Sequence, residues 1–198
     1  EAGFLGVIDL LEGNAIIYHD DLGQNIEIVA IPADMAEAAS SARHRLVELI
    51  AETNEEMMLR YLEDDDFSTD ELRAALRAAT LSGELVPILC GSSLKNKGIQ
   101  PMLDAIVSYL PSPLDVPPIT GLNPKTDEEE VRLVDVSAPF AGLVFKIQAD
   151  PHVGKLAYVR VYSGTLESGS YALNTTKGER ERIGRLLRMH ANSREEVQ

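Results

Sequence analysis

A short polar loop, Gly91-Ser92-Ser93-Leu94, is the part of this sequence whose residue types and position best suit ligand binding. It follows the continuous apolar run 85–90 and precedes helical spacing over 98–110, which predicts a buried strand, a loop and a helix. In such a unit, the loop's backbone N–H groups face a crevice beyond the carboxyl end of the strand. Small residues would let a planar base approach, although an ordinary polar strand-to-helix turn has the same composition.

The nucleotide-binding motifs that would accompany such a loop are missing from the sequence. It contains no G-x-x-x-x-G-K-[ST] run, the pattern that cradles phosphates. The segment 20–23 (DDLG) spells D-x-x-G, but it lies between two predicted strands and is interpreted as a hairpin turn. The segment 96–99 (NKGI) begins like N-K-x-D, but Ile99 replaces the aspartate that would hydrogen-bond guanine. We therefore predict that this chain alone does not hydrolyse GTP.

Catalytic and metal-binding patterns are also missing, so we predict no catalytic residue and no metal site. The chain has no H-E-x-x-H motif and no pair of cysteines, and its acidic runs 63–66 and 127–130 have the pattern of solvated surface. The single Cys90 suits a reducing cytoplasm, and no apolar run approaches the roughly 20 residues that span a bilayer. The scattered histidines are predicted to be surface or structural: His19, His44, His152 and His190.

Residues 1–83 carry the pattern of a small α+β unit. Apolar runs predict three strands joined by tight turns, over 4–10, 15–18 and 26–31. Three helices are expected to follow. The first opens at Pro32 and Asp34, the second is capped by Asn54, and the third begins with a capping box of Ser68 and Glu71 and ends near Gly83.

The rest of the chain predicts a linker and a β domain. Prolines and an acidic run indicate an extended linker over 113–138. Residues 139–198 have the pattern of short strands between glycine-containing turns, which suits a small antiparallel β-barrel.

Charge is divided unevenly along the chain. The net charge is −14, which argues against non-specific nucleic-acid binding by the whole molecule. Residues 1–110 carry 7 basic and 20 acidic side chains, whereas residues 139–198 carry 9 basic and 6 acidic ones. A basic strip in the second region could contact RNA phosphates, or it could be a solvated strand face whose charge Glu179 and Glu181 offset. The strip consists of Arg180, Arg182, Arg185 and Arg188.

Two long stretches of the chain resemble bacterial translation elongation factor G. They are PILCGSSLKNKGIQP over 87–101 and YLPSPLDVP over 109–117. Shorter similar segments extend the resemblance over nearly the whole chain: 6–10, 31–33, 81–84, 145–147, 150–151, 160–164, 181–184 and 189–192.

The resemblance implies a fold and a set of domains. The implied fold class is α+β, with the C-terminal part of an α/β GTPase domain, which carries an inserted α+β subdomain, followed by a partial antiparallel β-barrel. Residues 1–83 would be the inserted subdomain and 84–112 the last strand and helix of the GTPase domain. After the linker 113–138, residues 139–198 would begin the second domain.

The resemblance also assigns the opening loop a role. Ser92, Ser93 and Leu94 would be the fifth guanine-nucleotide motif, whose backbone contacts the base. Ser93 stands where the family has alanine, which a backbone contact tolerates.

By resemblance the chain is a fragment of a GTPase that moves transfer and messenger RNA on the ribosome. GTP or GDP with Mg²⁺ would bind the full-length parent, and none is expected on this fragment. The implied partners are small-subunit ribosomal RNA and the acidic stalk protein, the latter docking on 34–80, with no membrane partner. A truncated barrel edge would favour either an open sheet packed on the first domain or self-association.

Two alternatives remain open. The chain could be a non-catalytic module that binds the ribosome or the stalk protein. It could also belong to a related ribosomal GTPase, such as a peptide-release factor or a tetracycline-resistance protection protein, although 95–98 and 109–113 favour elongation factor G.

Overall fold

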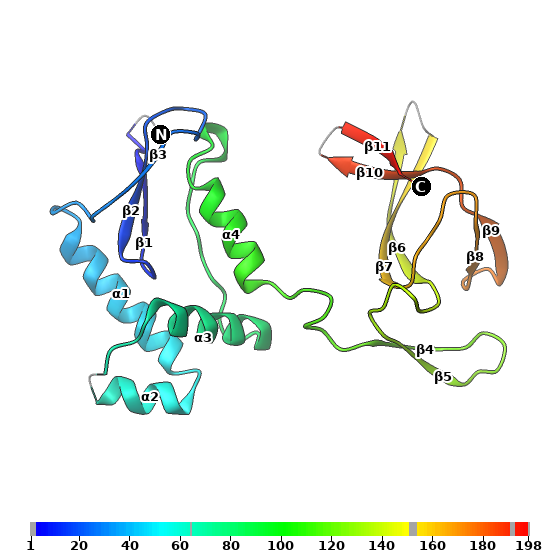
Figure 1. Ribbon diagram of the computed structural model, residues 1–198, viewed down its shortest axis with the longest axis horizontal. Helices are drawn as coiled ribbons and strands as arrows, with labels where there is room; N and C mark the ends of the chain where they lie inside the picture. The colour runs from blue at the N-terminus through cyan, green and yellow to red at the C-terminus, as the bar shows by residue number, and fades with distance from the viewer. Residues whose placement is uncertain (1–2, 64, 151–153, 191–192, 198) are drawn as a thin grey trace. The chain divides into compact units, whose positions relative to one another are not determined.

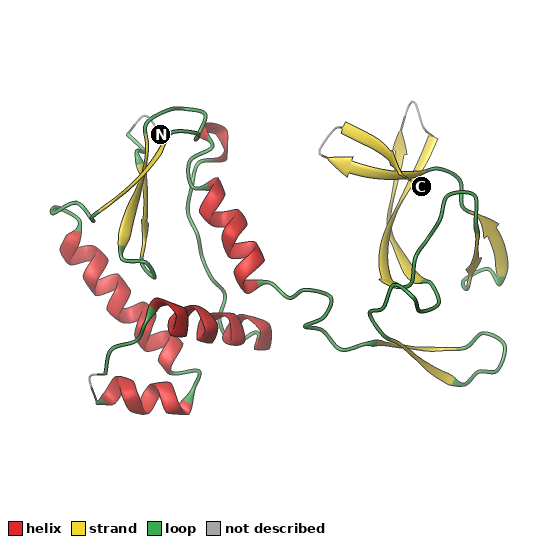
Figure 2. Ribbon diagram, in the orientation of Figure 1, coloured by secondary structure: helices red, strands yellow, loops and turns green. Residues whose placement is uncertain are grey.

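The computed structural model describes residues 3–63, 65–150, 154–190 and 193–197. It divides into two compact units, Glu1–Pro111 and Ser112–Gln198. Helices lie only in the first unit as far as the chain is described, as Figure 2 shows. None of these helices is long and apolar enough to cross a membrane. His152 and parts of the resembling segments 150–151 and 189–192 lie outside the described residues.

The first unit begins with a three-stranded antiparallel sheet in the order β1-β2-β3. Its strands are β1 (Gly6–Asp9), β2 (Asn14–Tyr18) and β3 (Ile26–Val29), which confirms the three strands predicted here. The Asp20 carboxylate accepts hydrogen bonds from the backbone N–H groups of Leu22, Gln24 and Asn25 at 2.9–3.1 Å. The D-x-x-G segment is therefore a hairpin turn, as predicted.

Three helices follow, α1 (Ala36–Ala51), α2 (Glu55–Leu62) and α3 (Thr69–Ser82). Asn54 caps α2 by accepting the N–H of Met57 at 3.0 Å. Ser68 and Glu71 form the predicted capping box, with Ser68 N–H donating to Glu71 Oε2 at 2.8 Å and Glu71 N–H to Ser68 Oγ at 3.3 Å. Gly83 ends α3 at a φ of 82°.

The predicted opening of α1 is wrong. Asp34 does not cap the helix, because its N-cap is Met35, which makes no side-chain cap hydrogen bond. A backbone turn provides the start instead, since Met35 N–H donates to Pro32 O at 2.9 Å. Pro32 therefore lies in the turn before α1.

The core of the first unit lies between the helices. Ile50 of α1 and Leu72 of α3 are fully buried, and Met57, Leu76 and Tyr109 join them. Burying one such side chain contributes about 1.5–3 kcal/mol. Tyr109 belongs to α4 (Ile99–Tyr109), so the core connects the helix after the polar loop to α3.

The predicted buried strand over 85–90 is wrong. The segment is extended between α3 and the short helix η1 (Ser93–Lys95), as Figure 1 shows, but it is assigned no strand. Val86 and Ile88 are 80% and 92% exposed. A strand needs a neighbour to accept and donate its backbone hydrogen bonds, and no described strand lies alongside this segment.

The apolar stripe predicted on helix 98–110 is mostly exposed: Met102, Leu103, Ile106 and Leu110 are exposed, and Ile99 is half-buried. The helix contacts the core through Tyr109, which is buried, and Ala105. The helix itself is confirmed. No described element of the unit covers the exposed part of the stripe.

The second unit consists of four antiparallel hairpins, each a two-stranded sheet. They are β4 (Ile119–Leu122) with β5 (Glu129–Arg132), β6 (Ala141–Asp150) with β7 (Gly154–Ser163), β8 (Tyr171–Asn174) with β9 (Glu179–Arg182), and β10 (Leu186–His190) with β11 (Ser193–Val197). The prediction of antiparallel strands is confirmed. The described strands do not close into a barrel, and no apolar side chain among them is fully buried.

The interpretation of 113–138 as a linker alone is corrected by the β4–β5 hairpin. Asn123 organises its turn, because its side-chain oxygen accepts the N–H of Lys125 at 2.9 Å and its amide donates to Glu130 at 2.6 Å. Arg132 pairs with the same glutamate. Part of the acidic run 127–130 therefore belongs to strand β5, which its charge pattern alone did not indicate.

Two glycines with the same backbone conformation give a matched test of packing. Gly83 and Gly98 have φ values of 82° and 81°, but a Cβ on Gly83 would meet nothing within 4 Å. On Gly98 it would lie 2.8 Å from Cys90 O and 3.0 Å from Gly91 Cα. We expect Gly83→Ala to lower the free energy of unfolding by about 1 kcal/mol. Gly98→Ala should cost about 2–4 kcal/mol, since overpacking adds to the same strain.

Urea unfolding followed by far-ultraviolet circular dichroism measures both variants. Equal losses of unfolding free energy in the two variants would show that the backbone at 90–91 moves aside at little energetic cost.

Candidate functional site

The polar loop is a closed backbone structure that begins with an isolated bridge between Ser92 and Lys97. Ser92 N–H donates to Lys97 O at 2.7 Å, and Lys97 N–H donates back to Ser92 O at 3.0 Å. Between them, Lys95 N–H donates to Ser92 O at 3.2 Å. Gly91 permits this closure, because a Cβ there would lie 2.7 Å from Lys97 O. The loop therefore holds its shape without a neighbouring strand.

Lys97 and Gln100 attach the loop to the first hairpins. Lys97 is buried, 6% exposed, and its Nζ donates to Phe4 O at 3.2 Å and lies 3.9 Å from Asp21 Oδ1. Gln100 Nε2 donates to Gly23 O at 2.7 Å. The D-x-x-G turn is thus a structural support for the loop.

Ser93 and Leu94 are the exposed part of the loop. As the first residues of a helical turn they have no intrahelical acceptor for their N–H groups. The Leu94 side chain is 86% exposed. The N–H groups of Ser93 and Leu94 are therefore left for a ligand acceptor, whereas that of Ser92 is used in the bridge to Lys97.

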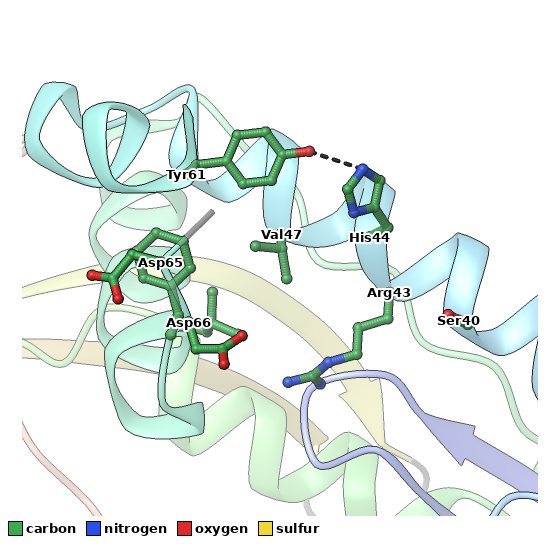
Figure 3. A pocket seen from close by; sticks show the side chains of 9 residues that line it. Ser40, Arg43, His44, Val47, Tyr61, Asp65 and Asp66 are labelled. Atoms are coloured by element: carbon green, nitrogen blue, oxygen red, sulfur yellow. Dashed lines mark hydrogen bonds between the residues drawn. The ribbon is translucent and has the colours of Figure 1, made fainter. Parts of the chain in front are cut away.

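A pocket that the sequence did not predict lies between α1, α2 and the start of α3 (Figure 3). Its volume is about 310 Å³. The Tyr61 hydroxyl and His44 Nε2 are 3.0 Å apart at its rim. Arg43 points into it from α1, but its guanidinium already donates to the carbonyls of Leu10 and Leu11. The pocket therefore offers few free polar groups and no catalytic arrangement.

Arg60 contacts two of the residues that line the pocket, Asp65 and Phe67. Its guanidinium donates to Glu71 at 2.7 Å and to Asp65 at 2.8 Å, and it lies 4.7 Å from the centre of the Phe67 ring. The hydrogen bond from Arg60, together with those from Ser68, lowers the pKa of Glu71 from 4.5 to about 2. These contacts hold the α2–α3 connection, so the acidic run 63–66 is partly paired.

The four predicted arginines come from two hairpins and the segment between them. Arg180 and Arg182 alternate with glutamates along β9 and therefore lie on one face of its hairpin. Arg188 belongs to β10, and its Nη1 lies 3.8 Å from Glu195 Oε2 of β11. Arg185 is exposed between the two hairpins. The register thus shows Arg180 and Arg182 on one face of the same hairpin.

Metal ligands do not gather anywhere in the described parts of the chain, where no three His, Cys, Asp or Glu residues could hold an ion. His19 lies 2.8 Å from a carboxylate oxygen of Glu27, and Cys90 is exposed.

Comparison with known proteins matches the chain both to a family and to solved structures. Residues 139–198 match the family of elongation factor G domain 2. The chain is also similar to a crystal structure of a protein from Thermus thermophilus, with a TM-score of 0.71 and 26% identity. That match covers 98% of this chain and 26% of the Thermus chain, so this chain spans about a quarter of that protein's length. Residues 139–198, with their antiparallel hairpins, thus form a domain of the translation elongation factor type.

Proposed function

We propose that this chain is a segment of a translational GTPase of the elongation factor G type. The parent would use GTP to move transfer and messenger RNA on the ribosome in the cytoplasm. The observation that carries the proposal is the match of residues 139–198 to elongation factor G domain 2. The loop with its exposed backbone donors, earlier in the same chain, supports it.

In this proposal the loop at 92–94 contacts the guanine base through its backbone. The buried Lys97 and the turn at Gly23 position the loop, since both hold it to the first hairpins. In such enzymes, phosphate and Mg²⁺ contacts provide the chemistry and much of the binding. A few base contacts contribute about 1 kcal/mol each, against about 8 kcal/mol for micromolar affinity. We therefore propose that the segment alone does not hydrolyse GTP.

Calorimetric titration with GDP and Mg²⁺ tests this assignment. We expect no heat up to about millimolar nucleotide, because a dissociation constant of about 1 mM already requires about 4 kcal/mol. Micromolar binding would reveal a phosphate site that the sequence motifs do not show. It would overturn the proposal that this segment provides only base contacts.

We also propose that the helical part of the first unit, residues 34–80, docks the ribosomal stalk protein. This region carries 12 acidic and 5 basic side chains, so its surface suits a basic face on a partner. The stalk protein is acidic overall by the same family resemblance, so docking would require a local cluster of lysine or arginine on it.

Charge reversal on two helix ends tests the stalk contact. Glu52 and Glu63 follow the C-termini of α1 and α2, where lysine suits the helix dipole and should preserve folding. We expect the double change to lysine to weaken binding of purified stalk protein about 3- to 10-fold at low salt, measured by surface plasmon resonance. Glu128→Lys with Glu167→Lys, in the second unit, makes the same charge change as a control.

Equal effects of the two pairs would mean that the contact follows net charge and not the helical region. If the folded chain without substitutions fails to bind the stalk protein, the docking proposal is wrong.

Self-association is a further property that we propose for the second unit. The β6–β7 hairpin has two open edges and exposes Leu143, Phe145 and Ile147. Exposed apolar strands with unpaired backbone groups are templates for pairing with another chain. The occupant we propose is a second copy of the same hairpin.

Sedimentation velocity should show association that grows with protein concentration. Ile147→Lys should shift the protein towards monomer, because a charge on an exposed strand opposes edge pairing. Val136→Lys makes the same change at an exposed position outside the hairpin and should leave association unchanged. If the chain without substitutions stays monomeric at every protein concentration, the prediction is wrong.

A related ribosomal GTPase remains the second candidate, because peptide-release factors and tetracycline-resistance protection proteins would share the architecture. The segments 95–98 and 109–113 favour elongation factor G.

A further inference from the structure

The β8–β9 hairpin sorts its side chains by charge. Directly opposed residues of an antiparallel pair lie on the same face, and the register pairs Tyr171 with Arg182 and Leu173 with Arg180. The same register pairs Ala172 with Glu181 and Asn174 with Glu179. One face therefore carries both arginines and the other both glutamates. We call the first the Tyr171 face: Tyr171, Leu173, Arg180 and Arg182.

The glutamates do not neutralise the Tyr171 face. Glu181 accepts hydrogen bonds from Lys177 Nζ at 3.0 Å and from Asn174 Nδ2 at 3.1 Å, both from its own side of the hairpin. The nearby Lys177 keeps the pKa of Glu181 below its usual value, so this carboxylate stays charged and paired. Among the described residues, neither Arg180 nor Arg182 forms an ion pair with a carboxylate. The Tyr171 face is therefore locally positive.

An aromatic ring lies open between these positive charges. Tyr171 is 59% exposed and Leu173 44% exposed, whereas Tyr18 and Tyr109 are buried. The Arg180 guanidinium lies 5.5 Å from the centre of the Tyr171 ring. That distance is within cation–π range but longer than a tight stack, so the ring remains accessible to a planar group.

The chemistry of the face indicates its ligand. Two guanidinium groups without a carboxylate partner suit phosphates, and an exposed ring beside them suits a nucleobase. A base within a duplex is already stacked on its neighbours and cannot reach the ring, whereas an unpaired base can. Charge complementarity thus favours a nucleic-acid strand, and the ring adds a preference for unstacked bases.

We propose that the Tyr171 face binds an unpaired RNA base. The base stacks on Tyr171, and Arg180 and Arg182 hold the flanking phosphates. This inference rests on the proposed function, in which the full-length protein acts on the ribosome and small-subunit ribosomal RNA is a partner by resemblance. It adds a base-stacking residue and a preference for single-stranded over duplex RNA.

Fluorescence anisotropy with the full chain tests the stacking step. The probes are a labelled oligouridylate of about 12 nucleotides, whose bases stack little on each other, and an RNA duplex of about the same length. Tyr171→Leu keeps an apolar side chain but removes the ring, and Tyr171→Phe keeps the ring. We expect Tyr171→Leu to weaken single-strand binding about 10-fold and to leave duplex binding unchanged, while Tyr171→Phe stays close to the parent.

A charge-matched pair tests the phosphate contact. Arg182→Gln and Lys177→Gln each remove one positive charge, but the two side chains lie on opposite faces of the hairpin. Arg182→Gln should weaken binding of both RNAs and reduce the slope of log affinity against log salt by about 0.7 for the single strand. Lys177→Gln should have little effect. The substituted positions are exposed, and circular dichroism checks that each variant folds.

Three outcomes distinguish a failure of this inference from a failure of the proposed function. Unchanged single-strand binding by Tyr171→Leu would overturn base stacking and leave the RNA contact in place. Equal weakening by Arg182→Gln and Lys177→Gln would overturn the assignment of the face. If the chain without substitutions binds neither RNA, the proposed RNA contact itself is wrong, and the Tyr171 face would instead suit a protein partner.

Discussion

The need of every strand backbone for a hydrogen-bonding neighbour determines what this chain forms. The segments 6–9, 14–18 and 26–29 satisfy each other in one sheet. The apolar segment 85–90 has the composition of a strand but lies alongside no described strand, so it stays extended and exposed. In the second unit the requirement is met only in pairs, which leaves every described hairpin with open edges. The first unit therefore has a core of buried apolar side chains, whereas none of the described apolar side chains of the second unit is buried.

Helices escape that requirement, because each satisfies its backbone internally except at its ends. The capping box at Ser68, the side-chain cap at Asn54 and the left-handed Gly83 supply the ends of α2 and α3. Burial of Ile50 and Leu72 then holds the helices together. Because these helices need no neighbouring strand, the side chains of α1–α3 can pack directly into a core. The apolar face of α4 is only partly buried.

Features set by local chemistry were the ones that the sequence predicted well. The caps of α2 and α3, the hairpin turn at Asp20 and the antiparallel hairpins are each specified within a few residues, whereas the start of α1 was misplaced. Features that depend on distant partners were predicted less well, such as the strand at 85–90 and the buried stripe on α4. The shared face of Arg180 and Arg182 with Tyr171 and Leu173 needed the strand register. The alternation of Glu and Arg over 179–182 was the sequence pattern that indicated one face for the two arginines.

The polar loop shows how a site can be prepared without its neighbours. Its closure between Ser92 and Lys97 uses only its own backbone, and Gly91 and Gly98 allow two chain segments to approach within contact distance. Lys97 and Gln100 then fix it to the first hairpins. None of these contacts requires a strand alongside segment 85–90. A ligand would therefore meet donors that are already ordered, and the entropy of ordering the loop would not oppose its binding. Weak nucleotide affinity of this segment would then reflect too few contacts and not a disordered loop.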